Sequence, residues 1–598
     1  SMPWNDTAQL NYLNHDTREA VIQTILQVAR QFPIIRFDAA MTLAKKHFQR
    51  LWFPIPGTGS DVASRADFGM TKEAFDAIMG EEFWREVVDR VAKEVPDTLL
   101  LAEAFWMMEG FFVRSLGMHR VYNSAFMNML KMEENGQYRL SIKQTLEFDP
   151  EILKRFVNFM NNPDEEPAVI QFGDGDKYFG VATLLVTMPG LPMWGHGQTE
   201  GFHEKYGMEY IRSYWDENPD QHLVERHQHE IFPLIKKRHL FADSTHFRLY
   251  DFYTKEGFIN ENVFAYSNSK NNEYALIIVN NAYESTAGNI RFSVPFKDKS
   301  KDELRVESIM DAFRLHNRMD DYVVFQEQRS GLEYLRRIRD IADYGFYAVL
   351  NGYESQVYLN FNVWAASDQL RFLYDDLNGR GVASISSELL VLPFRGIHQS
   401  LDVLISSFVD NNAKEIEQSV KAVFQTVDKN DRIDIEDSGS DKIIQSIIQH
   451  NNDVFKRYMK NRPEWFKDEM LVATNLLVVA QSMGNELWWK LYDEAMLDRY
   501  INIKCGLTSG KWETLLDQMG EQPKSVFELI LQKTENIGFQ QLMGYNEWDG
   551  NRYIQKDQFE EFLSVCYLLG IKETQTCHAI LVKTEYLFDK FIEKIEKV

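Results

Sequence analysis

The first third of the chain alternates amphipathic helical segments with short apolar runs, and this alternation limits the folds open to it. The segment DTREAVIQTILQVARQ (16–31) has its apolar residues at helical spacing, and IIRFDAA (34–40) follows it as a short buried strand. A second pair consists of the helix EEFWREVVDRVAKE (81–94) and the strand TLLLAEAF (98–105). Such alternation is typical of parallel α/β units, whose chemistry lies at the carboxyl ends of the strands.

From about residue 245 the hydrophobic period changes from helical spacing to alternation. HFRLYDFYT (246–254) and EYALIIVNNA (273–282) alternate apolar with polar residues between turn signals, which is typical of an antiparallel β-sandwich. The segment SGLEYLRRIRDIADYG (330–345) is expected to be a helix inserted into that sandwich. Beyond about residue 365 the apolar patterns are helical, so we expect an α-helical region there.

Three acidic residues lie where a parallel α/β fold places its chemistry. Asp38 ends the first strand, and Arg36, two positions earlier, should point the same way and hold Asp38 ionised. Glu103 ends the second strand in an apolar setting, which raises the pKa of a carboxyl group as a general acid requires. Asp164, with Asn162 beside it, follows a later helix–strand unit. Converging carboxylates suit glycoside hydrolysis, although acidic strand ends also occur in α/β proteins without catalytic activity.

Four segments carry a resemblance to the α-amylase superfamily of glycoside hydrolases. IIRFDAA (34–40) resembles the family's fourth-strand motif, and LLLAEAF (99–105) resembles its fifth-strand motif. FMNNPDE (159–165) is similar to the seventh-strand motif, and GLPMWGHGQTEG (190–201) to the eighth-strand motif. The motifs occur in the family's order, and the β-sandwich that we expect after them matches its usual third domain.

The resemblance implies roles for individual residues. Asp38 would be the nucleophile of a retaining mechanism and Glu103 the general acid/base, while Asp164 would bind sugar hydroxyls and stabilise the transition state. The implied activity is that of an α-glucan-active hydrolase or transglycosylase, and no residue decides between hydrolysis and transfer. The residues expected to contact the sugar are Arg36, Asn162, Trp194 and His196, although core packing explains Trp194 equally well.

The chain also departs from the family pattern. Met41 and Thr42 stand where the family commonly has a Lys-His pair after the nucleophile, and Pro163 replaces the His of the Asn-His-Asp motif. The family's Asp-x-x-x-x-Asn-His motif on the third strand is absent. The resemblance therefore implies a partial TIM-type (β/α)8 barrel with about five of eight strands, as in the C-terminal part of a longer enzyme or one piece of a split one.

Five parallel strands cannot close a barrel, because closure ties strand number to tilt and shear. We therefore expect that these 598 residues do not act alone as a complete enzyme. Either a complementary chain supplies the first three strands, or the chain forms an open half-barrel. The expected domains are the C-terminal part of the catalytic barrel over residues 1–240, the β-sandwich over 241–364 and the α-helical domain over 365–598.

The departures leave a second interpretation open. Pro163, Met41 and Thr42 would also suit a non-catalytic glucan-binding or scaffolding protein built on a degenerate amylase frame. Turnover of maltooligosaccharides that is abolished by Asp38→Asn would exclude that alternative.

Charge and composition exclude several partner classes. The net charge of −24 repels phosphate backbones and anionic lipid surfaces, so neither nucleic acid nor a membrane is an expected partner. The chain has 3 cysteines, which fits a reducing compartment and weakly favours the cytoplasm, although localisation stays open. We expect neither a metal ion nor a cofactor, since His222, His227 and His229 do not share one helical side and suit a solvated helix.

Overall fold

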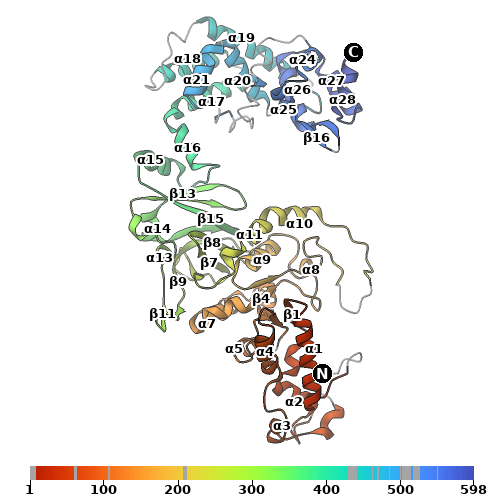
Figure 1. The fold of residues 1–598 in the computed structure, drawn as a ribbon. Coiled ribbons are helices and arrows are strands. Elements are labelled where there is room, and N and C mark those ends of the chain that lie inside the picture. The colour runs from red at the N-terminus through yellow and green to blue at the C-terminus, as the bar shows by residue number, and fades with distance from the viewer. Residues whose placement is uncertain are drawn as a thin grey trace. The chain divides into compact units, whose positions relative to one another are not determined.

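The computed structural model forms two compact units, Ser1–Ala383 and Ser384–Val598, which are described separately (Figure 1). The residues that the structure describes are 8–59, 63–105, 108–205, 212–410, 413–428, 441–460, 462–467, 470–483, 485–497, 500–501, 514–515, 525–548 and 550–597.

A five-stranded parallel sheet with the order β1-β2-β3-β4-β5 opens the first unit. Within the described residues β1 pairs only with β2 and β5 only with β4, so the sheet is open at both edges. The prediction of a partial barrel with five strands is confirmed, and the source of any further strands stays a prediction. The strands are β1 (Ile34–Phe37), β2 (Leu99–Ala102), β3 (Arg120–Tyr122), β4 (Phe156–Phe159) and β5 (Leu191–Met193).

Amphipathic helices cover this sheet because each has one apolar side to bury. The helix α1 buries Ile22 and Leu26, and α4 buries Val87 and Val91, in the same core as Leu100 of β2. The helices of the first unit are α1 (His15–Ala29), α2 (Lys45–Trp52), α3 (Lys72–Ile78), α4 (Phe83–Glu94), α5 (Glu109–Arg114), α6 (Ser124–Lys131), α7 (Asn135–Phe148), α8 (Ala168–Phe172), α9 (Asp176–Thr187), α10 (Gln221–Arg226), α11 (Phe232–Lys236), α12 (Arg238–Phe241), α13 (Ile309–Ala312), α14 (Ile338–Tyr344) and α15 (Asp368–Leu377).

An eight-stranded antiparallel sheet follows, with the order β13-β12-β15-β8-β7-β6-β9-β14. Its two ends face each other, since the rings of Phe325 on β12 and Phe346 on β14 are 5.4 Å apart, and the sheet therefore curls around its own core as a sandwich does. The strands are β6 (Arg248–Thr254), β7 (Val263–Lys270), β8 (Glu273–Asn280), β9 (Thr286–Ser293), β12 (Tyr322–Glu327), β13 (Glu333–Arg337), β14 (Phe346–Leu350) and β15 (Ser355–Trp364), with a separate hairpin of β10 (Phe296–Asp298) and β11 (Glu303–Arg305).

The other face of the curled sheet packs on α9, which belongs to the same apolar core as β4 (Figure 1). Side chains alternate along β8, so Ile278 points into the core of the curled sheet while Ile277 points toward α9. The hydroxyl groups of Thr187 on α9 and Tyr266 on β7 are 2.6 Å apart. Because it is covered on both sides, α9 is buried from Tyr178 to Thr187.

The helix predicted over residues 330–345 is wrong in its first half, which forms β13. Its residues pair with β12, and the ring of Tyr334 stacks on Phe325 at 5.9 Å. Pairing and ring contact across the sheet outweigh the local helical spacing. The second half, α14, is helical as predicted.

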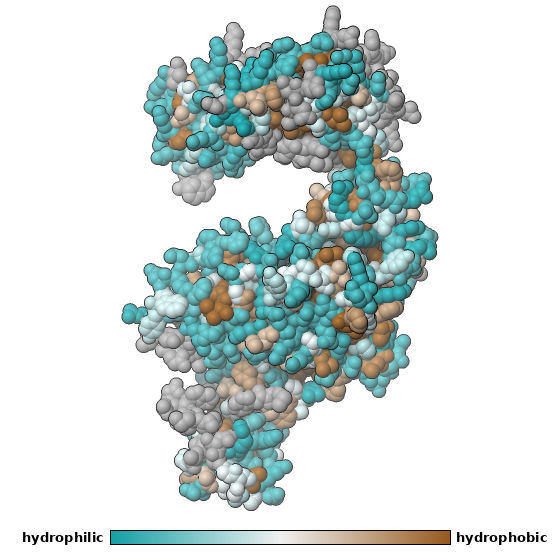
Figure 2. Space-filling model, turned by 180° about the vertical axis from the view of Figure 1, so that it is seen from behind, coloured by the Kyte–Doolittle hydropathy of each residue, from teal (hydrophilic) through white to brown (hydrophobic). Residues whose placement is uncertain are grey.

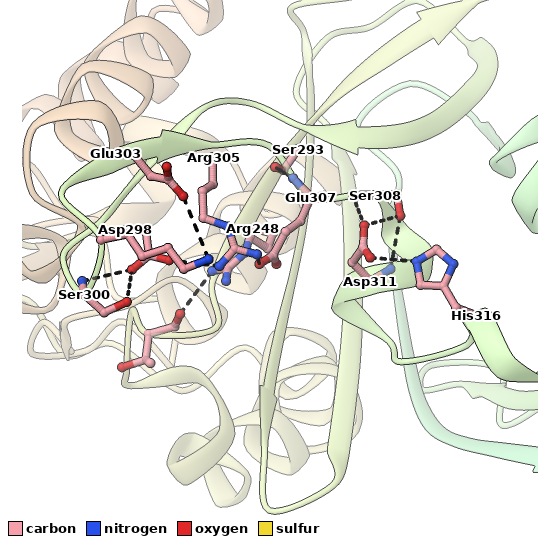
Figure 3. Close-up of polar contacts among 12 residues, drawn as sticks. Arg248, Ser293, Asp298, Ser300, Glu303, Arg305, Glu307, Ser308, Asp311 and His316 are labelled. Carbon is pink, nitrogen blue, oxygen red and sulfur yellow. Dashed lines mark hydrogen bonds and ion pairs between the residues drawn. The ribbon is translucent and has the colours of Figure 1, made fainter.

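A network of charged side chains fixes the β10–β11 hairpin to β6 (Figure 3). The Nε of the buried Arg248 donates to Glu307 Oε2 at 2.7 Å, and its guanidinium lies 3.9 Å from the ring centroid of Phe296. Arg305 pairs with Asp298 at 2.9 Å and with Glu307 at 3.3 Å. These groups satisfy one another, so the network serves the fold.

The second unit is helical, and α20 lies in its core. The helix α20 is apolar on all sides, and it is buried along most of its length because α19 and α26 pack against it. The helices of this unit are α16 (Ile385–Val391), α17 (Arg395–Asp410), α18 (Ala413–Asp428), α19 (Asp441–Tyr458), α20 (Met470–Met483), α21 (Asn485–Glu494), α24 (Val526–Lys533), α25 (Ile537–Leu542), α26 (Lys556–Leu569), α27 (Thr574–Lys583) and α28 (Phe588–Ile595), with a hairpin of β16 (Tyr545–Trp548) and β17 (Asn551–Ile554).

The boundary between the units falls after residue 383, whereas the helical domain was expected from residue 365. The helix α15 lies between these positions and belongs to the first unit, where Tyr374 donates to Asp340 of α14 at 2.6 Å.

None of the described helices is both long and apolar enough to cross a membrane. On the face in Figure 2, hydrophilic residues predominate and hydrophobic ones form small separate groups.

Candidate active site

Arg36 joins the two leading carboxylate candidates at the carboxyl ends of β1 and β2. Its Nη1 lies 3.1 Å from Asp38 Oδ1, and its Nη2 donates to Glu103 Oε2 at 2.9 Å. The parallel register brings them together, since the backbone N–H of Glu103 donates to the carbonyl of Phe37 at 3.0 Å. One guanidinium therefore contacts both carboxyl groups.

Glu103 has the environment of a general acid. The residue is 2% exposed, and burial is the main cause that raises its pKa to about 7, with the adjacent Asp38 carboxyl adding to the rise. The backbone N–H of Ala39, which donates to Glu103 Oε2 at 3.0 Å, and the Arg36 charge act in the opposite direction. Glu103 Oε1 is buried and has no hydrogen-bond partner among the described residues. A carboxyl group with this pKa can give and take a proton near neutral pH.

Tyr122, at the end of β3, is a site residue that the sequence reasoning missed. Its hydroxyl accepts a hydrogen bond from Arg36 Nε at 2.7 Å, and burial raises its pKa. Together with the two carboxyl groups it fixes the guanidinium on three sides. Its place at the end of the third strand, beside the two strands that carry the carboxylates, is the signal that could have indicated it.

Asn162 organises the loop after β4. Its Oδ1 accepts hydrogen bonds from the backbone N–H groups of Asp164 at 2.9 Å and Glu165 at 3.0 Å. Asp164 itself is exposed, and within the described residues no hydrogen bond or ion pair joins its side chain to Asp38 or Glu103. Burial is the first cause of the raised pKa of Tyr122, and the Asp164 charge is a lesser one.

A cavity of about 270 Å³ lies beside these strand ends and brings four of the predicted residues together. Arg36, Asn162, Trp194 and His196, which the sequence predicted as sugar contacts, all line it. Asp38, Glu103 and Asp164 are not among its lining residues. The structure thus places the binding candidates in one cavity and the carboxylates around Arg36 next to it.

Two buried amides belong to the wall of this cavity. Asn161 and Asn162 are 6% and 4% exposed, and the Oδ1 of the first and the Nδ2 of the second are buried without a partner among the described residues. Sequence reasoning missed Asn161, whose side chain lies against Gly195 so closely that a Cβ on that glycine would collide with it.

Trp194 is half-buried and held from two sides. Its Nε1 donates to Thr199 Oγ1 at 2.9 Å, and its ring lies 5.7 Å from the ring of His227.

The prediction of a solvated helix is wrong for His227, which is fully buried in a π-helical turn, with Nε2 3.2 Å from the hydroxyl of Tyr178. Burial lowers the pKa of His227, so this histidine supports Trp194 as a neutral ring.

The described residues contain no group of three or more His, Cys, Asp or Glu side chains placed to hold a metal ion.

No protein-family model matches the sequence, and no curated protein is similar to it. Among solved structures, the chain is similar to a debranching enzyme from Nostoc punctiforme, with 15% identity and a TM-score of 0.37 over 59% of this chain and 62% of that one. It is similar to an α-amylase from Geobacillus thermoleovorans, with 12% identity and a TM-score of 0.36 over 60% of this chain and 66% of that one.

An α-amylase from H. orenii gives 14% identity and a TM-score of 0.37 over 60% of this chain and 67% of that one. The match spans less than two thirds of the Nostoc enzyme.

Proposed function

We propose that this chain carries the catalytic carboxylates of a retaining α-glucan-active glycoside hydrolase or transglycosylase of the α-amylase type. One observation carries the proposal: Arg36 contacts Asp38 and a buried Glu103 whose pKa is raised to about 7. The environments differ as the two roles require, since Glu103 is buried whereas the Asp38 side chain is 54% exposed and ion-paired.

The mechanism assigns each carboxyl group two steps. The Asp38 carboxylate attacks the anomeric carbon and forms an ester with the sugar, while the Glu103 carboxyl gives its proton to the departing glycosidic oxygen. Glu103, now ionised, takes a proton from a water molecule or from the hydroxyl of a second sugar. That oxygen then displaces Asp38 from the anomeric carbon, which completes hydrolysis or transfer with retained configuration.

The shared arginine supports the retaining geometry. Retaining enzymes hold their carboxyl groups about 5–5.5 Å apart, and inverting enzymes leave about 6.5–9.5 Å for a water molecule. Asp38 and Glu103 lie 3.1 Å and 2.9 Å from nitrogens of one guanidinium, which supports a close pair. In the same proposal Asp164 would bind sugar hydroxyls, together with Asn162, Trp194 and His196 of the cavity.

The open sheet adds a structural requirement. Among the described residues β1 and β5 each pair on one side alone, which supports the proposal that further parallel strands complete the barrel, in this polypeptide or in a complementary chain. Activity would then need those strands, because they would form the opposite wall of the substrate cleft.

The test is hydrolysis of maltoheptaose by the wild-type chain and by Asp38→Asn, each combined with a polypeptide that carries an Asp-x-x-x-x-Asn-His motif, with the anomeric form of the first product followed by NMR. We expect retained configuration in the wild type and a loss of roughly a thousand-fold or more in the variant. An inverted product, or a variant as active as the wild type, would overturn the proposal. The assay is repeated without the added polypeptide, and full activity of the chain alone would contradict the need for further strands.

A second candidate function is non-catalytic glucan binding. The observation that favours it is the cavity, whose lining contains the four sugar-contact candidates without Asp38, Glu103 or Asp164. Maltoheptaose binding that Asp38→Asn leaves unchanged, with no turnover in any combination of chains, supports this candidate over the first.

A further inference from the structure

We propose that Tyr214 and Trp215 form an aromatic platform that binds a neutral glucan chain where it leaves the cavity beside Arg36. The inference rests on the proposed function for its substrate class and adds a binding surface that the sequence motifs do not include. It follows from how the loop is braced, from its continuity with the cavity and from the exposure of the two rings.

Two glutamates brace the loop that carries the rings. The Glu204 side chain accepts hydrogen bonds from the backbone N–H groups of Tyr214 at 2.7 Å and Trp215 at 3.0 Å. The Glu217 side chain in turn accepts from the backbone N–H groups of His203 at 2.7 Å and Glu204 at 2.8 Å. Hydrogen bonds to an ionised carboxylate are roughly twice as strong as neutral ones, so this reciprocal pair holds the backbone under both rings in one conformation.

The braced loop is continuous with the cavity. Glu204 and Lys205 both line it, together with Trp194 and His196. Lys205 Nζ donates to the backbone carbonyl of Asp164 at 2.7 Å and so ties this loop to the one after β4. The residue that positions Tyr214 and Trp215 is therefore also part of the cavity wall.

The two rings are exposed although their size favours burial. Tyr214 is 69% exposed and Trp215 is 56% exposed. Large aromatic side chains usually cover core or interface surface, and neighbouring exposed rings on a fixed backbone are typical of a binding surface. Tyr and Trp side chains have only two χ angles, so they lose little conformational entropy when a ligand binds. This favours stacking of the rings on the flat face of a sugar.

The surrounding charge and the amides select a neutral polyhydroxylated ligand. Glu204 and Glu217 bond to the backbone of this loop, Asp216 follows Trp215 in the sequence, and the net charge of the chain is −24, so an anionic ligand is disfavoured. Asn161, Asn162 and His196 line the adjoining cavity, and side chains of these types form hydrogen bonds with hydroxyl groups. A chain of sugars that extends from the cavity to the rings would contact both surfaces.

The experiment measures binding of maltoheptaose and of maltose to the full chain by isothermal titration calorimetry. We expect Trp215→Ala and Tyr214→Ala each to weaken maltoheptaose binding about ten-fold and to leave maltose binding nearly unchanged. Trp215→Phe, which keeps a ring, should retain most of the affinity. Tyr344→Ala removes a tyrosine that is 72% exposed on α14 and serves as the matched control without effect.

The outcomes separate this inference from the proposed catalytic function. Platform variants that bind maltoheptaose as well as the wild type, or a wild type that binds no maltoheptaose, overturn the platform. Asp38→Asn should keep the wild-type affinity while losing turnover. If neither the wild type nor any variant turns over substrate, but Trp215→Ala loses affinity and Trp215→Phe keeps it, the proposed catalytic function is refuted and the aromatic platform is supported.

Discussion

Arg36 donates to Glu103 at 2.9 Å, yet the pKa of the carboxyl group is raised. A guanidinium beside a carboxylate normally lowers that pKa, because it favours the charged form. Here burial and the nearby Asp38 carboxyl outweigh it, and the pKa reaches about 7. The arginine therefore holds the acid in position without fixing it in the ionised form.

Activity should fall as the pH rises through about 7. Glu103 must carry a proton to act on the departing oxygen, and its pKa of about 7 means that the protonated fraction declines above that value. The measurement is the pH dependence of kcat/KM on maltoheptaose. The Glu103→Gln variant should lose the activity and, with it, the decline above about pH 7. A wild-type rate that stays level to about pH 9 would contradict the assignment.

Glu103→Gln should stabilise the fold at alkaline pH. Because its pKa is raised, Glu103 binds more protons in the folded state than in the unfolded state between pH 4.5, its ordinary pKa, and about pH 7. The unfolding free energy of the wild type therefore falls as the pH rises through this window. The neutral amide avoids this loss, and we expect a gain of about 1–3 kcal/mol at pH 8 that shrinks toward pH 5.

Urea unfolding of both proteins at the two pH values measures this difference. Equal stability changes at pH 5 and pH 8 would show that ionisation of Glu103 does not cost folding free energy. The expected result is a more stable but inactive variant, as is common when a catalytic group is removed.

Gly195→Ala should damage the cavity. A Cβ at this position would collide with the Asn161 side chain, so we expect a loss of about 1–3 kcal/mol in unfolding free energy and weaker binding of maltoheptaose. Gly175→Ala is the matched control, because a Cβ there meets nothing within 4 Å. Unfolding and calorimetric titration measure both effects, and a Gly195→Ala protein that matches the control in both would refute the close approach.

Arg248→Met should lower the unfolding free energy of the first unit by about 3 kcal/mol, because the Glu307 carboxylate would lose its ion pair with Arg248. Both side chains are largely buried, so water would not replace the lost partner. Arg339→Met is the control, since its ion pair with Asp320 is exposed and should contribute less than about 1 kcal/mol. Chemical unfolding distinguishes them, and similar losses in both variants would argue against a special role for the network in Figure 3.

The strand ends that carry Asp38 and Glu103 could be predicted because each follows an apolar run of strand length. Tyr122 could have been included, because it ends the third strand of the same sheet. Asn161 could not, since nothing near it in the sequence records the glycine that it meets across the fold. The burial of His227 was missed because a π-helical turn breaks the 3.6-residue spacing on which the prediction relied.

The position of α9 limits where this chain can be truncated or recombined. The helix belongs to the parallel part of the chain by sequence, but part of its cover comes from the curled sheet. A truncation or a recombination event between the two sheets would strip that cover and expose an apolar helix to water. The half-barrel and the curled sheet therefore have to stay together when the chain is cut, whereas a cut after residue 383 leaves the cover of α9 in place.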